Sequence, residues 1–497
     1  MDVDWISRAR DLKPRVLDFV DGRWKPGLGD ELVSKFGSRD GKLLYEFSAT
    51  SPAQLTDAVA AASTAFQDGR WSGGSAQHRK ETLLELASLV ENHREELALL
   101  ECLDVGKPIR DALTIDIPFA VSILRYNAEA VDKLYSKIYA VSRSNISFQL
   151  RRPVGVVAAI VGWNFPLVLA AQKIAPALAM GNSLVLKPSE FTSLAAGRLA
   201  ELALEAGLPP GVLNVVNGGA SVGNALARHP DVDLLTFTGS SRTGKALLVA
   251  AGESNMKRLL LECGGKAPSI VFDDCPTLEE AADAIVSRVF WNQGEVCSAS
   301  SRLLVHESVK PELMKLVIQK ADALRPGDPL IHGTAFGALV SGAHMKKVLG
   351  YVDAGIRDGA TLIHQTTYKA PFADGFYVPP TIFADVAPNH RIAQEEIFGP
   401  VLSVISFQDE AEAVRIANGT VYGLSAILWT KDLGRAHRLA LNLCAGSIVI
   451  NATAKPEGGP AEGVIPSGGL KQSGFGVEGG LEGLVAYSSP SAVQIFV

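Results

Sequence analysis

The sequence predicts an α/β protein built on parallel sheets, with a smaller β segment beside them. From residue 154 onward, short apolar runs alternate with amphipathic helical patterns, and a second such unit runs from about 267 to 446. Residues 146–150 and the chain end instead alternate apolar and polar positions, as half-exposed strands do. Buried strands separated by helices are typical of a parallel sheet covered by helices on both faces.

The bulk composition is that of a globular protein. The 497 residues, 47% hydrophobic and 20% charged, leave room for two or three domains and a sizeable core. A net charge of -6 without a basic stretch predicts no nucleic-acid or membrane partner. The five cysteines and nine histidines show no ligand-like spacing, so we expect no disulfide framework and no metal. Because neither a secretory leader nor an apolar span is visible, we expect a cytoplasmic protein.

The N-terminal part predicts helices followed by a strand. Ser51 and Pro52 suit the start of a helix that continues to Phe66 with apolar residues on one face. A longer amphipathic stretch follows at 78–103. The spacing of apolar residues then changes to the alternation that predicts the strand at 146–150.

The next part of the chain predicts the main sheet. Strands are expected at 154–161, Ser183–Lys187, 212–216, 234–237 and 259–261, and helices at 167–180, 193–206 and 242–251. The second unit ends in a strand at 447–451, and the alternation at 493–497 predicts a terminal strand. In parallel sheets, ligands bind at the carboxyl ends of the strands.

A G-x-G-x-x-G pattern occurs once, at Gly474, Gly476 and Gly479. It follows no predicted strand and opens no βαβ unit, so we interpret it as a turn and not as a dinucleotide-binding loop.

Cys297 is the first candidate for chemistry. Residues 290–297 read Phe-Trp-Asn-Gln-Gly-Glu-Val-Cys, which places one thiol after a helical pattern and a glycine turn. A thiol at such a junction can be polarised by nearby amides and act as a nucleophile. The alternative is a small core residue, because free cysteine is often buried.

Two predicted strands end in residues suited to an oxyanion and a ribose. Residues 162–166 read Gly-Trp-Asn-Phe-Pro, and the Asn164 amide either donates to an oxyanion or caps the next helix. The next strand ends in Lys187 and is followed by Glu190, a pair that suits a ribose diol. Glu190 would repel a 2′-phosphate and so favours NAD over NADP, whereas the alternative is a solvated ion pair.

Two further strands end in a phosphate candidate and a base candidate. Gly239 and Ser240 precede a helical pattern, which makes either a phosphate site or a plain turn. Glu262 precedes a Gly-Gly turn, where partial burial would raise its pKa and make it a general base for water. The alternative is a surface carboxylate. Glu396, close to the aromatic Phe398, is a second candidate for a ribose clamp.

Together these motifs resemble the aldehyde dehydrogenase superfamily, in the family's order and over nearly the whole chain. Residues 103–110 and 255–258 resemble bacterial γ-glutamyl-γ-aminobutyraldehyde and related aminoaldehyde dehydrogenases. The resemblance implies a Rossmann-like NAD-binding domain at 1–131 and 155–264 and an α/β catalytic domain at 265–447. It also implies a β oligomerisation arm at 132–154 and 478–497 that builds homodimers or homotetramers.

The resemblance also implies a mechanism. Cys297 would attack the aldehyde, and Asn164 with the Cys297 amide would hold the oxyanion of the thiohemiacetal. After hydride passes to the nicotinamide, Glu262 would activate the water that hydrolyses the thioester to a carboxylic acid. Lys173 and Glu478 occupy positions that relay protons. The implied cofactor is NAD, with NADP less favoured, and the implied cofactor-binding residues are Trp163, Lys187, Glu190, Gly239, Ser240, Glu396 and Phe398.

The chain departs from the commonest family pattern around the substrate entrance. Gln172 and Ser467 stand where aromatic residues are frequent, Val477 replaces an arginine, and Cys263 brings a second thiol close to the predicted base. Gln172, Ser467 and the long segment 452–464 would line the substrate entrance and replace its aromatic lining with polar volume. The implied substrate-binding residues are Phe165, Gln172, Val296, Ser298 and Ser467.

The predicted substrate is therefore an elongated polar or amino aldehyde. Its amine would be attracted by Glu457 or Glu462, in the long segment 452–464. One alternative keeps the chemistry but acts on an aromatic aldehyde, and another is a thiol esterase that uses Cys297 and Glu262 without redox. A CoA-acylating dehydrogenase and a non-catalytic protein are disfavoured, because the base and the whole catalytic set are present.

Overall fold

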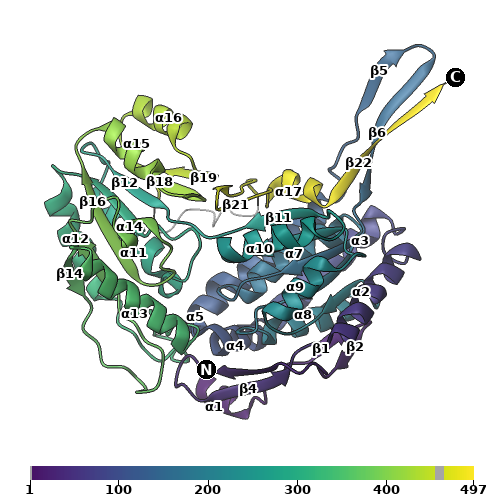
Figure 1. Ribbon diagram of the computed structural model, residues 1–497, viewed down its shortest axis with the longest axis horizontal. Coiled ribbons are helices and arrows are strands. Elements are labelled where there is room, and N and C mark those ends of the chain that lie inside the picture. Colours follow the sequence, from purple (N-terminus) through teal and green to yellow (C-terminus); the bar gives the residue numbers. More distant parts are fainter. Residues whose placement is uncertain (1–2, 454–463, 497) are drawn as a thin grey trace.

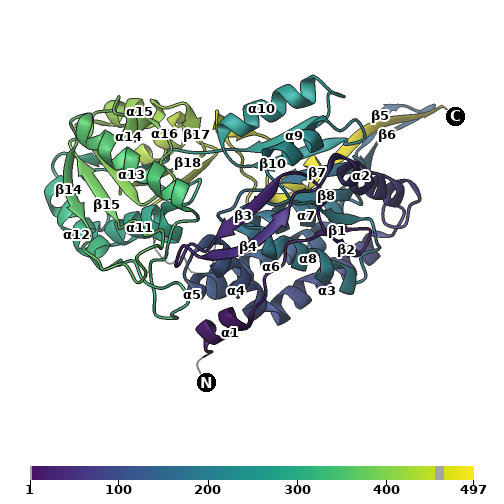
Figure 2. The same cartoon turned by 60° about the horizontal axis from the view of Figure 1, so that its bottom comes forward.

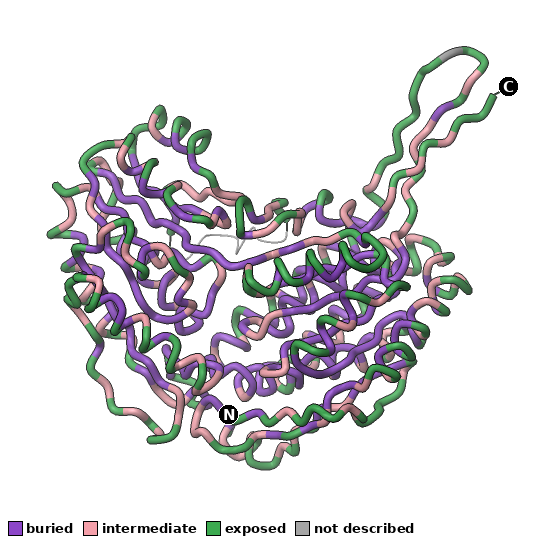
Figure 3. The backbone as a smooth tube through the Cα atoms, viewed as in Figure 1, coloured by how far each residue is buried: buried purple, intermediate pink, exposed green. Residues whose placement is uncertain are grey.

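The computed structural model describes residues 3–453 and 464–496 and confirms the α/β fold. Figure 1 shows two lobes, each built on its own sheet, and a narrow β arm that projects from one of them. Figure 3 shows that the strands and covering helices of both lobes are largely buried, whereas the arm is mostly exposed.

The first lobe contains an eight-stranded sheet with the order β2-β1-β9-β8-β7-β10-β11-β21. Its strands are β1 (Asp18–Val20), β2 (Arg23–Lys25), β7 (Val156–Ile160), β8 (Ser183–Lys187), β9 (Leu213–Val215), β10 (Leu234–Thr238), β11 (Arg258–Glu262) and β21 (Gly474–Phe475). Five neighbouring strands run parallel to one another, in the order β9, β8, β7, β10 and β11. The strands at the two ends of the sheet, β1 beside β9 and β21 beside β11, are antiparallel to their neighbours. All five strands predicted for this region are confirmed.

Helices cover both faces of this sheet. They are α1 (Trp5–Asp11), α2 (Pro52–Gln67), α3 (Ala76–Asn92), α4 (Arg94–Val105), α5 (Ile109–Asp111), α6 (Ile117–Ala130), α7 (Pro166–Ala179), α8 (Leu194–Glu205), α9 (Ala220–Arg228) and α10 (Ser241–Gly252), with a π-helical turn at Ala112–Asp116. Alternate residues of β7 point to opposite faces. Val157 and Ala159 pack with α3, α6 and α7, whereas Val156 and Ala158 pack with α2, α9 and α10.

Local sequence explains where two of these helices begin and end. Helix α2 begins with a capping box, in which Ser51 and Gln54 satisfy each other's backbone N–H groups and Pro52 occupies the first turn. The amphipathic stretch predicted at 78–103 forms two helices, α3 and α4. The chain leaves helical angles at His93, with φ -96° and ψ 17°.

The second lobe contains a seven-stranded sheet with the order β14-β15-β16-β13-β12-β18-β19. Its strands are β12 (Pro268–Val271), β13 (Arg302–His306), β14 (Thr361–Gln365), β15 (Thr381–Ala384), β16 (Val401–Phe407), β18 (Ser425–Trp429) and β19 (Ser447–Ile450). Its helices are α11 (Leu278–Phe290), α12 (Lys310–Asp322), α13 (Gly342–Arg357), α14 (Arg391–Gln394), α15 (Glu410–Asn418) and α16 (Leu433–Asn442). The strand predicted at 447–451 is confirmed as the edge strand β19.

Three small β elements lie outside the two large sheets. Strands β3 (Leu32–Phe36) and β4 (Leu43–Ser48) form a hairpin that Figure 2 brings to the front, and β17 (Tyr422–Gly423) pairs with β20 (Leu470–Lys471). The arm consists of β5 (Ile138–Ser142), β6 (Asn145–Pro153) and β22 (Ser488–Phe496), and α17 (Gly480–Ala486) precedes β22. Both predicted arm strands are confirmed, although Val497 lies outside the described residues.

The G-x-G-x-x-G pattern is not a dinucleotide-binding loop. Gly474 begins β21, which is antiparallel to β11, and Gly476 and Gly479 follow with positive φ angles of 113° and 74°. The turn interpretation holds for the last two glycines, whereas the first belongs to a strand. In the described ranges 3–453 and 464–496, no helix is long and apolar enough to cross a membrane.

Candidate active site

The candidate site lies at the carboxyl edge of the first sheet. Strands β8, β7, β10 and β11 are parallel neighbours, so the residues that follow them meet at one edge. This topology brings together residues that lie far apart in the sequence. They are Trp163 and Asn164 after β7, Lys187 and Glu190 at the end of β8, Gly239 and Ser240 after β10, and Glu262 at the end of β11.

A sharp turn holds Cys297 at this edge. After α11, Asn292, Gln293 and Gly294 adopt positive φ angles of 48°, 57° and 74° in succession. A Cβ on Gly294 would lie 2.4 Å from the backbone of Gly399, so only glycine fits there. Cys297 is half-buried in the loop that results.

Asn164 is fixed against the cysteine loop. Its Nδ2 donates to the carbonyl oxygen of Glu295 at 2.9 Å, and Asn292 Nδ2 donates to the carbonyl oxygen of Asn164 at 3.1 Å. The second N–H of the Asn164 amide is left for another acceptor. The alternative role of Asn164 as a helix cap is wrong, because the N-cap of α7 is Phe165.

The Cys297 thiol is protonated at neutral pH in this environment. Burial, together with the carboxylates of Glu396 and Glu262, raises its pKa to about 12, although the backbone N–H groups of Ser298 and Cys297 act in the opposite direction. Reaction at the sulfur therefore requires a proton acceptor, a compensating positive charge, or both.

Glu262 has the properties of a general base. Its Oε1 is buried and lacks a hydrogen-bond partner, which leaves this atom available to a substrate or a water. Burial raises the pKa of Glu262 to about 7, whereas the Lys173 ammonium group and the Gly469 backbone N–H lower it. A carboxylate that is half ionised near neutral pH accepts and releases protons efficiently.

Lys173 and Glu478 connect this base with the surface. They form a close ion pair in which the Lys173 side chain is fully buried and that of Glu478 is 17% exposed. Burial lowers the pKa of Lys173 to about 8. Ser467, predicted at the substrate entrance, exchanges two backbone hydrogen bonds of 2.9 and 2.8 Å with Glu478. Glu478 thus contacts both Lys173 and Ser467.

The edge formed by β8 and β10 fits a dinucleotide. Lys187 Nζ lies 3.6 Å from Glu190 Oε2, and because Lys187 is buried this is not a fully solvated ion pair. Ser240 caps α10 by accepting from the Thr243 N–H. A Cβ atom on Gly239 would lie 2.4 Å from the Phe237 ring, so no side chain fits at this position of the turn before α10. A turn that carries no side chain at this position, at a helix N-terminus, leaves backbone N–H groups available to a phosphate.

Glu396 and Phe398 reach this edge from the second lobe. Glu396 Oε1 accepts a hydrogen bond from the Gly265 N–H at 2.9 Å. A Cβ atom on Gly264 would lie 2.2 Å from Glu396 Oε2, so the carboxylate occupies the space that the absence of a side chain at Gly264 leaves open. The ring of Phe398 lies 5.1 Å from that of Trp163. These contacts join the two lobes beside Cys297.

His344 belongs to the same junction but was not predicted. Its Nε2 lies 2.7 Å from the Phe398 carbonyl oxygen, and its ring lies 5.1 Å from that of Trp163. Burial lowers the pKa of His344 to about 4. Nothing in the local sequence distinguishes this histidine from the others.

The predicted substrate residues surround the cysteine loop. Phe165 packs against Trp291 with ring centroids 5.1 Å apart and the ring planes tilted by 37°. Val296 is buried and Ser298 is exposed on either side of Cys297, and Gln172 is half-buried on α7 immediately before Lys173. Trp291 was not among the predicted site residues, although an aromatic residue directly before the cysteine loop could have indicated it.

Two other expectations concern the amine-attracting carboxylates Glu457 and Glu462 and the second thiol, Cys263. Glu457 and Glu462 lie outside the described residues. Cys263 is buried in the core under α10, where a Cβ on Gly244 would lie 2.8 Å from its sulfur. Burial raises the pKa of Cys263 to about 12, as it does for Cys297, so the two thiols differ in position: Cys263 is buried in the core and Cys297 is half-buried.

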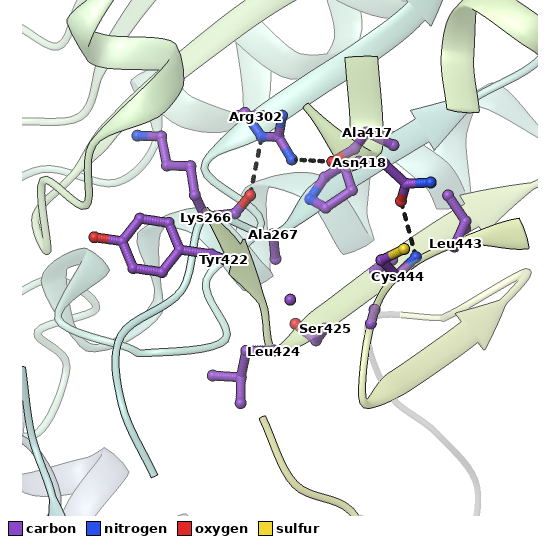
Figure 4. Close-up of a pocket in the computed structure, with 14 residues that line it drawn as sticks. Lys266, Ala267, Arg302, Ala417, Asn418, Tyr422, Leu424, Ser425, Leu443 and Cys444 are labelled. Atoms are coloured by element: carbon purple, nitrogen blue, oxygen red, sulfur yellow. Dashed lines mark hydrogen bonds between the residues drawn. The ribbon is translucent and has the colours of Figure 1, made fainter. Parts of the chain in front are cut away.

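A separate pocket in the second lobe is too small for a substrate. Figure 4 shows it between Lys266, Arg302, Asn418 and Cys444, and its cavity of about 10 Å³ holds roughly one water molecule. None of the predicted site residues lines it. Among the residues that the structure describes, no group of three or more histidine, cysteine or carboxylate side chains is arranged to hold a metal ion.

The fold and this edge fit an α/β oxidoreductase with a reactive cysteine. The model of the aldehyde dehydrogenase family matches residues 24–493, and the chain belongs to that family. This confirms the resemblance found in the motifs.

Three similar proteins cover almost the whole chain. The sequence is 44% identical over 492 residues to NADP/NAD-dependent aldehyde dehydrogenase PuuC of Escherichia coli (strain K12), covering 99% of this chain and 98% of that protein. The crystal structure of an indole-3-acetaldehyde dehydrogenase complexed with NAD+ matches with 46% identity and a TM-score of 0.96, over 99% of both chains. That of γ-glutamyl-γ-aminobutyraldehyde dehydrogenase from Burkholderia cenocepacia J2315 matches with 44% identity and a TM-score of 0.95, over 99% of both chains.

Proposed function

We propose that the protein oxidises an elongated polar or amino aldehyde to the carboxylic acid, with NAD as the preferred cofactor and Cys297 as the nucleophile. Its membership of the aldehyde dehydrogenase family supports the reaction class. The residue roles are supported by the contact of the Cys297 loop with the Asn164 amide and by the influence of Glu262 on Cys297, at the carboxyl edge of the first sheet.

The first step is addition of the thiol to the aldehyde. The sulfur forms a bond to the carbonyl carbon, the π electrons move to oxygen, and the thiol proton passes through water to the solvent. The free N–H of the Asn164 amide and the Cys297 backbone N–H would hold the oxyanion of the thiohemiacetal. One such donor is worth about 2.7–4 kcal/mol of barrier.

The cofactor would bind across the edge of the first sheet. Lys187 and Glu190 would hold the adenosine ribose, and Gly239 and Ser240 the phosphates. Glu396, Phe398 and Trp163 would hold the nicotinamide riboside. When bound, NAD supplies a positively charged ring that accepts the hydride. We assign residues 1–131 and 155–264 to cofactor binding and 265–447 to the catalytic domain.

The second half of the reaction is hydrolysis of the thioester on Cys297. Glu262 takes a proton from a water molecule, whose oxygen forms the new bond to the acyl carbon while the thiolate leaves. Lys173 and Glu478 would carry the proton from Glu262 to the solvent along the ion pair described above.

A substrate panel tests the proposed aldehyde class. We expect a higher kcat/KM for aminoaldehydes than for benzaldehyde-type or indole-type aldehydes, because Gln172 and Ser467 make the entrance more polar. Gln172→Trp should move the preference toward aromatic aldehydes by roughly tenfold, the scale of one apolar contact. An aromatic preference in the unaltered enzyme would contradict the proposal.

An aromatic aldehyde is the second candidate substrate. Two observations favour it: the contact between the Phe165 and Trp291 rings beside the cysteine loop, and the similarity to an indole-3-acetaldehyde dehydrogenase. The same panel decides between the two classes.

Glu190 should set the cofactor preference. Its carboxylate would lie beside the 2′-phosphate of NADP, and such a like-charge contact costs several kcal/mol. We expect Glu190→Ala to raise kcat/KM for NADP by at least about tenfold, whereas Glu190→Asp, which keeps the charge, should not. Kinetics with both cofactors measure this, and an unchanged NADP/NAD ratio in the alanine variant would refute the assignment.

The arm at 132–154 and 478–497 should join subunits into a homodimer or homotetramer. Apolar side chains on this three-stranded sheet are exposed, with Ile138 79%, Val141 61% and Phe496 74% accessible. Light scattering should give two or four times the chain mass of 52.6 kDa, and Ile138→Asp should weaken the assembly. A monomeric parent protein would contradict this proposal. The cytoplasmic location stays a prediction.

A further inference from the structure

Helix α4 carries two buried carboxylates that belong to none of the groups assigned above. Glu101 and Asp104 are both 0% exposed. They lie three positions apart, so they project from the same face of the helix. Each accepts a hydrogen bond from the first turn of a different helix that begins beside the active site.

Glu101 caps the helix that follows Asn164. The N-cap residue of α7, Phe165, makes no side-chain cap, and Pro166 at the next position has no N–H. The first available backbone donor is therefore Leu167, and its N–H donates to Glu101 Oε1 at 2.5 Å. A carboxylate at this place also interacts favourably with the positive end of the helix dipole.

The other oxygen of Glu101 faces a buried cation that also fixes Phe165. Lys107 Nζ lies 3.5 Å from Glu101 Oε2 and 4.2 Å from the centroid of the Phe165 ring. Asp116, from the π-helical turn Ala112–Asp116, forms a close ion pair with the same ammonium group. Glu101 and Lys107 thus hold Leu167 and Phe165, the residues that directly follow Asn164.

Asp104 caps the helix that follows the loop of Glu190. Its Oδ2 accepts from the Leu194 N–H at 3.0 Å, at the start of α8. The N-cap residue Ser193 does not cap this turn, because its hydroxyl donates to the Ser189 carbonyl at 3.1 Å. Tyr45 donates to Asp104 Oδ1 at 2.8 Å and keeps the carboxylate in place. Asp104 therefore supports the loop that carries Glu190.

We propose that Glu101 and Asp104 are positioning residues on one helix, Glu101 for the oxyanion donor Asn164 and Asp104 for the ribose carboxylate Glu190. This inference rests on the proposed function of those two residues. Because the supported loops differ, the two carboxylates should affect different kinetic constants. Loss of Glu101 displaces a group that acts in the transition state and lowers kcat, whereas loss of Asp104 weakens cofactor binding and raises the KM for NAD.

The test compares Glu101→Leu with Asp104→Leu, which is a matched control on the same helix. In the full-length enzyme, Glu101→Leu should lower kcat on the order of 100-fold and leave the KM for NAD unchanged. Asp104→Leu should raise that KM roughly tenfold and leave kcat unchanged. Glu101→Gln and Asp104→Asn keep an acceptor oxygen but lose the charge, so they should show the same split with smaller effects.

The Gln and Asn variants decide the question if a leucine variant does not fold. A purely structural role would lower the melting temperature of all variants without separating kcat from KM, and this outcome would overturn the inference. Asn164→Ala serves as the reference and should lower kcat about 10²–10³-fold. If Asn164→Ala leaves kcat unchanged, the proposed function fails; if only the Glu101 variants leave it unchanged, the inference alone fails.

Discussion

Replacing Cys297 with alanine should abolish aldehyde oxidation and leave NAD binding intact. The substitution removes the atom that forms the covalent bond, and loss of a nucleophile costs on the order of 10⁶-fold in turnover in comparable covalent enzymes. The cofactor residues lie on other strands and loops, so their geometry should not change. Steady-state kinetics measure the loss, and fluorescence titration with NAD measures the retained binding.

The exposed Cys444 provides the control for this experiment. Its thiol lines the small pocket in the second lobe, to which none of the predicted site residues contributes, so Cys444→Ala should keep full activity. Residual turnover of Cys297→Ala within about tenfold of the parent enzyme would show that another group carries the reaction, because a genuine nucleophile is worth far more than this factor.

Replacing Glu262 with glutamine should stop the reaction at the thioester. Glutamine cannot accept the proton of the attacking water, and loss of a general base costs about 10²–10⁴-fold. Rapid mixing of the variant with NAD and aldehyde should produce a burst of one NADH per active site at most, followed by a slow steady state. Mass spectrometry of the quenched variant should find the acyl group on Cys297. Full steady-state turnover without a trapped acyl group would refute the role of Glu262.

The pH dependence of the parent enzyme provides a second test of Glu262. Its pKa is raised by burial to about 7, and the base acts in its ionised form. The rate of thioester hydrolysis should therefore rise with pH through about 7 and then level off. In Glu262→Gln this rise should disappear, whereas an unchanged profile would assign the titration to another group.

The sequence predicted the part of the site that depends on strand order. The alternation of buried strands and helices predicted parallel neighbours, and parallel strands end at one edge, which is why Asn164, Glu190 and Glu262 could be expected there. The strand limits were also accurate, because apolar runs such as Ser183–Lys187 end abruptly at charged or turn residues.

Features that depend on contacts between distant segments could not be predicted. The left-handed turn at Asn292 and Gln293 carries no glycine or proline signal at those positions. It is held by hydrogen bonds to distant residues, from Asn292 to the Asn164 carbonyl oxygen and from the Gly337 N–H to Gln293. The cap that Glu101 gives to α7 joins residues 66 positions apart. The position of Cys263 under α10 depends on which face of the strand end it occupies, and the resemblance to a family did not decide that.

The most direct measurement is the near-ultraviolet absorbance of NADH after the purified enzyme is mixed with NAD and an aminoaldehyde. The account predicts a rise in which one NADH appears for each carboxylic acid formed, and no rise with Cys297→Ala. If activated esters are hydrolysed at Cys297 while no aldehyde in the panel yields NADH, the protein is a thiol esterase and the proposed redox function is wrong.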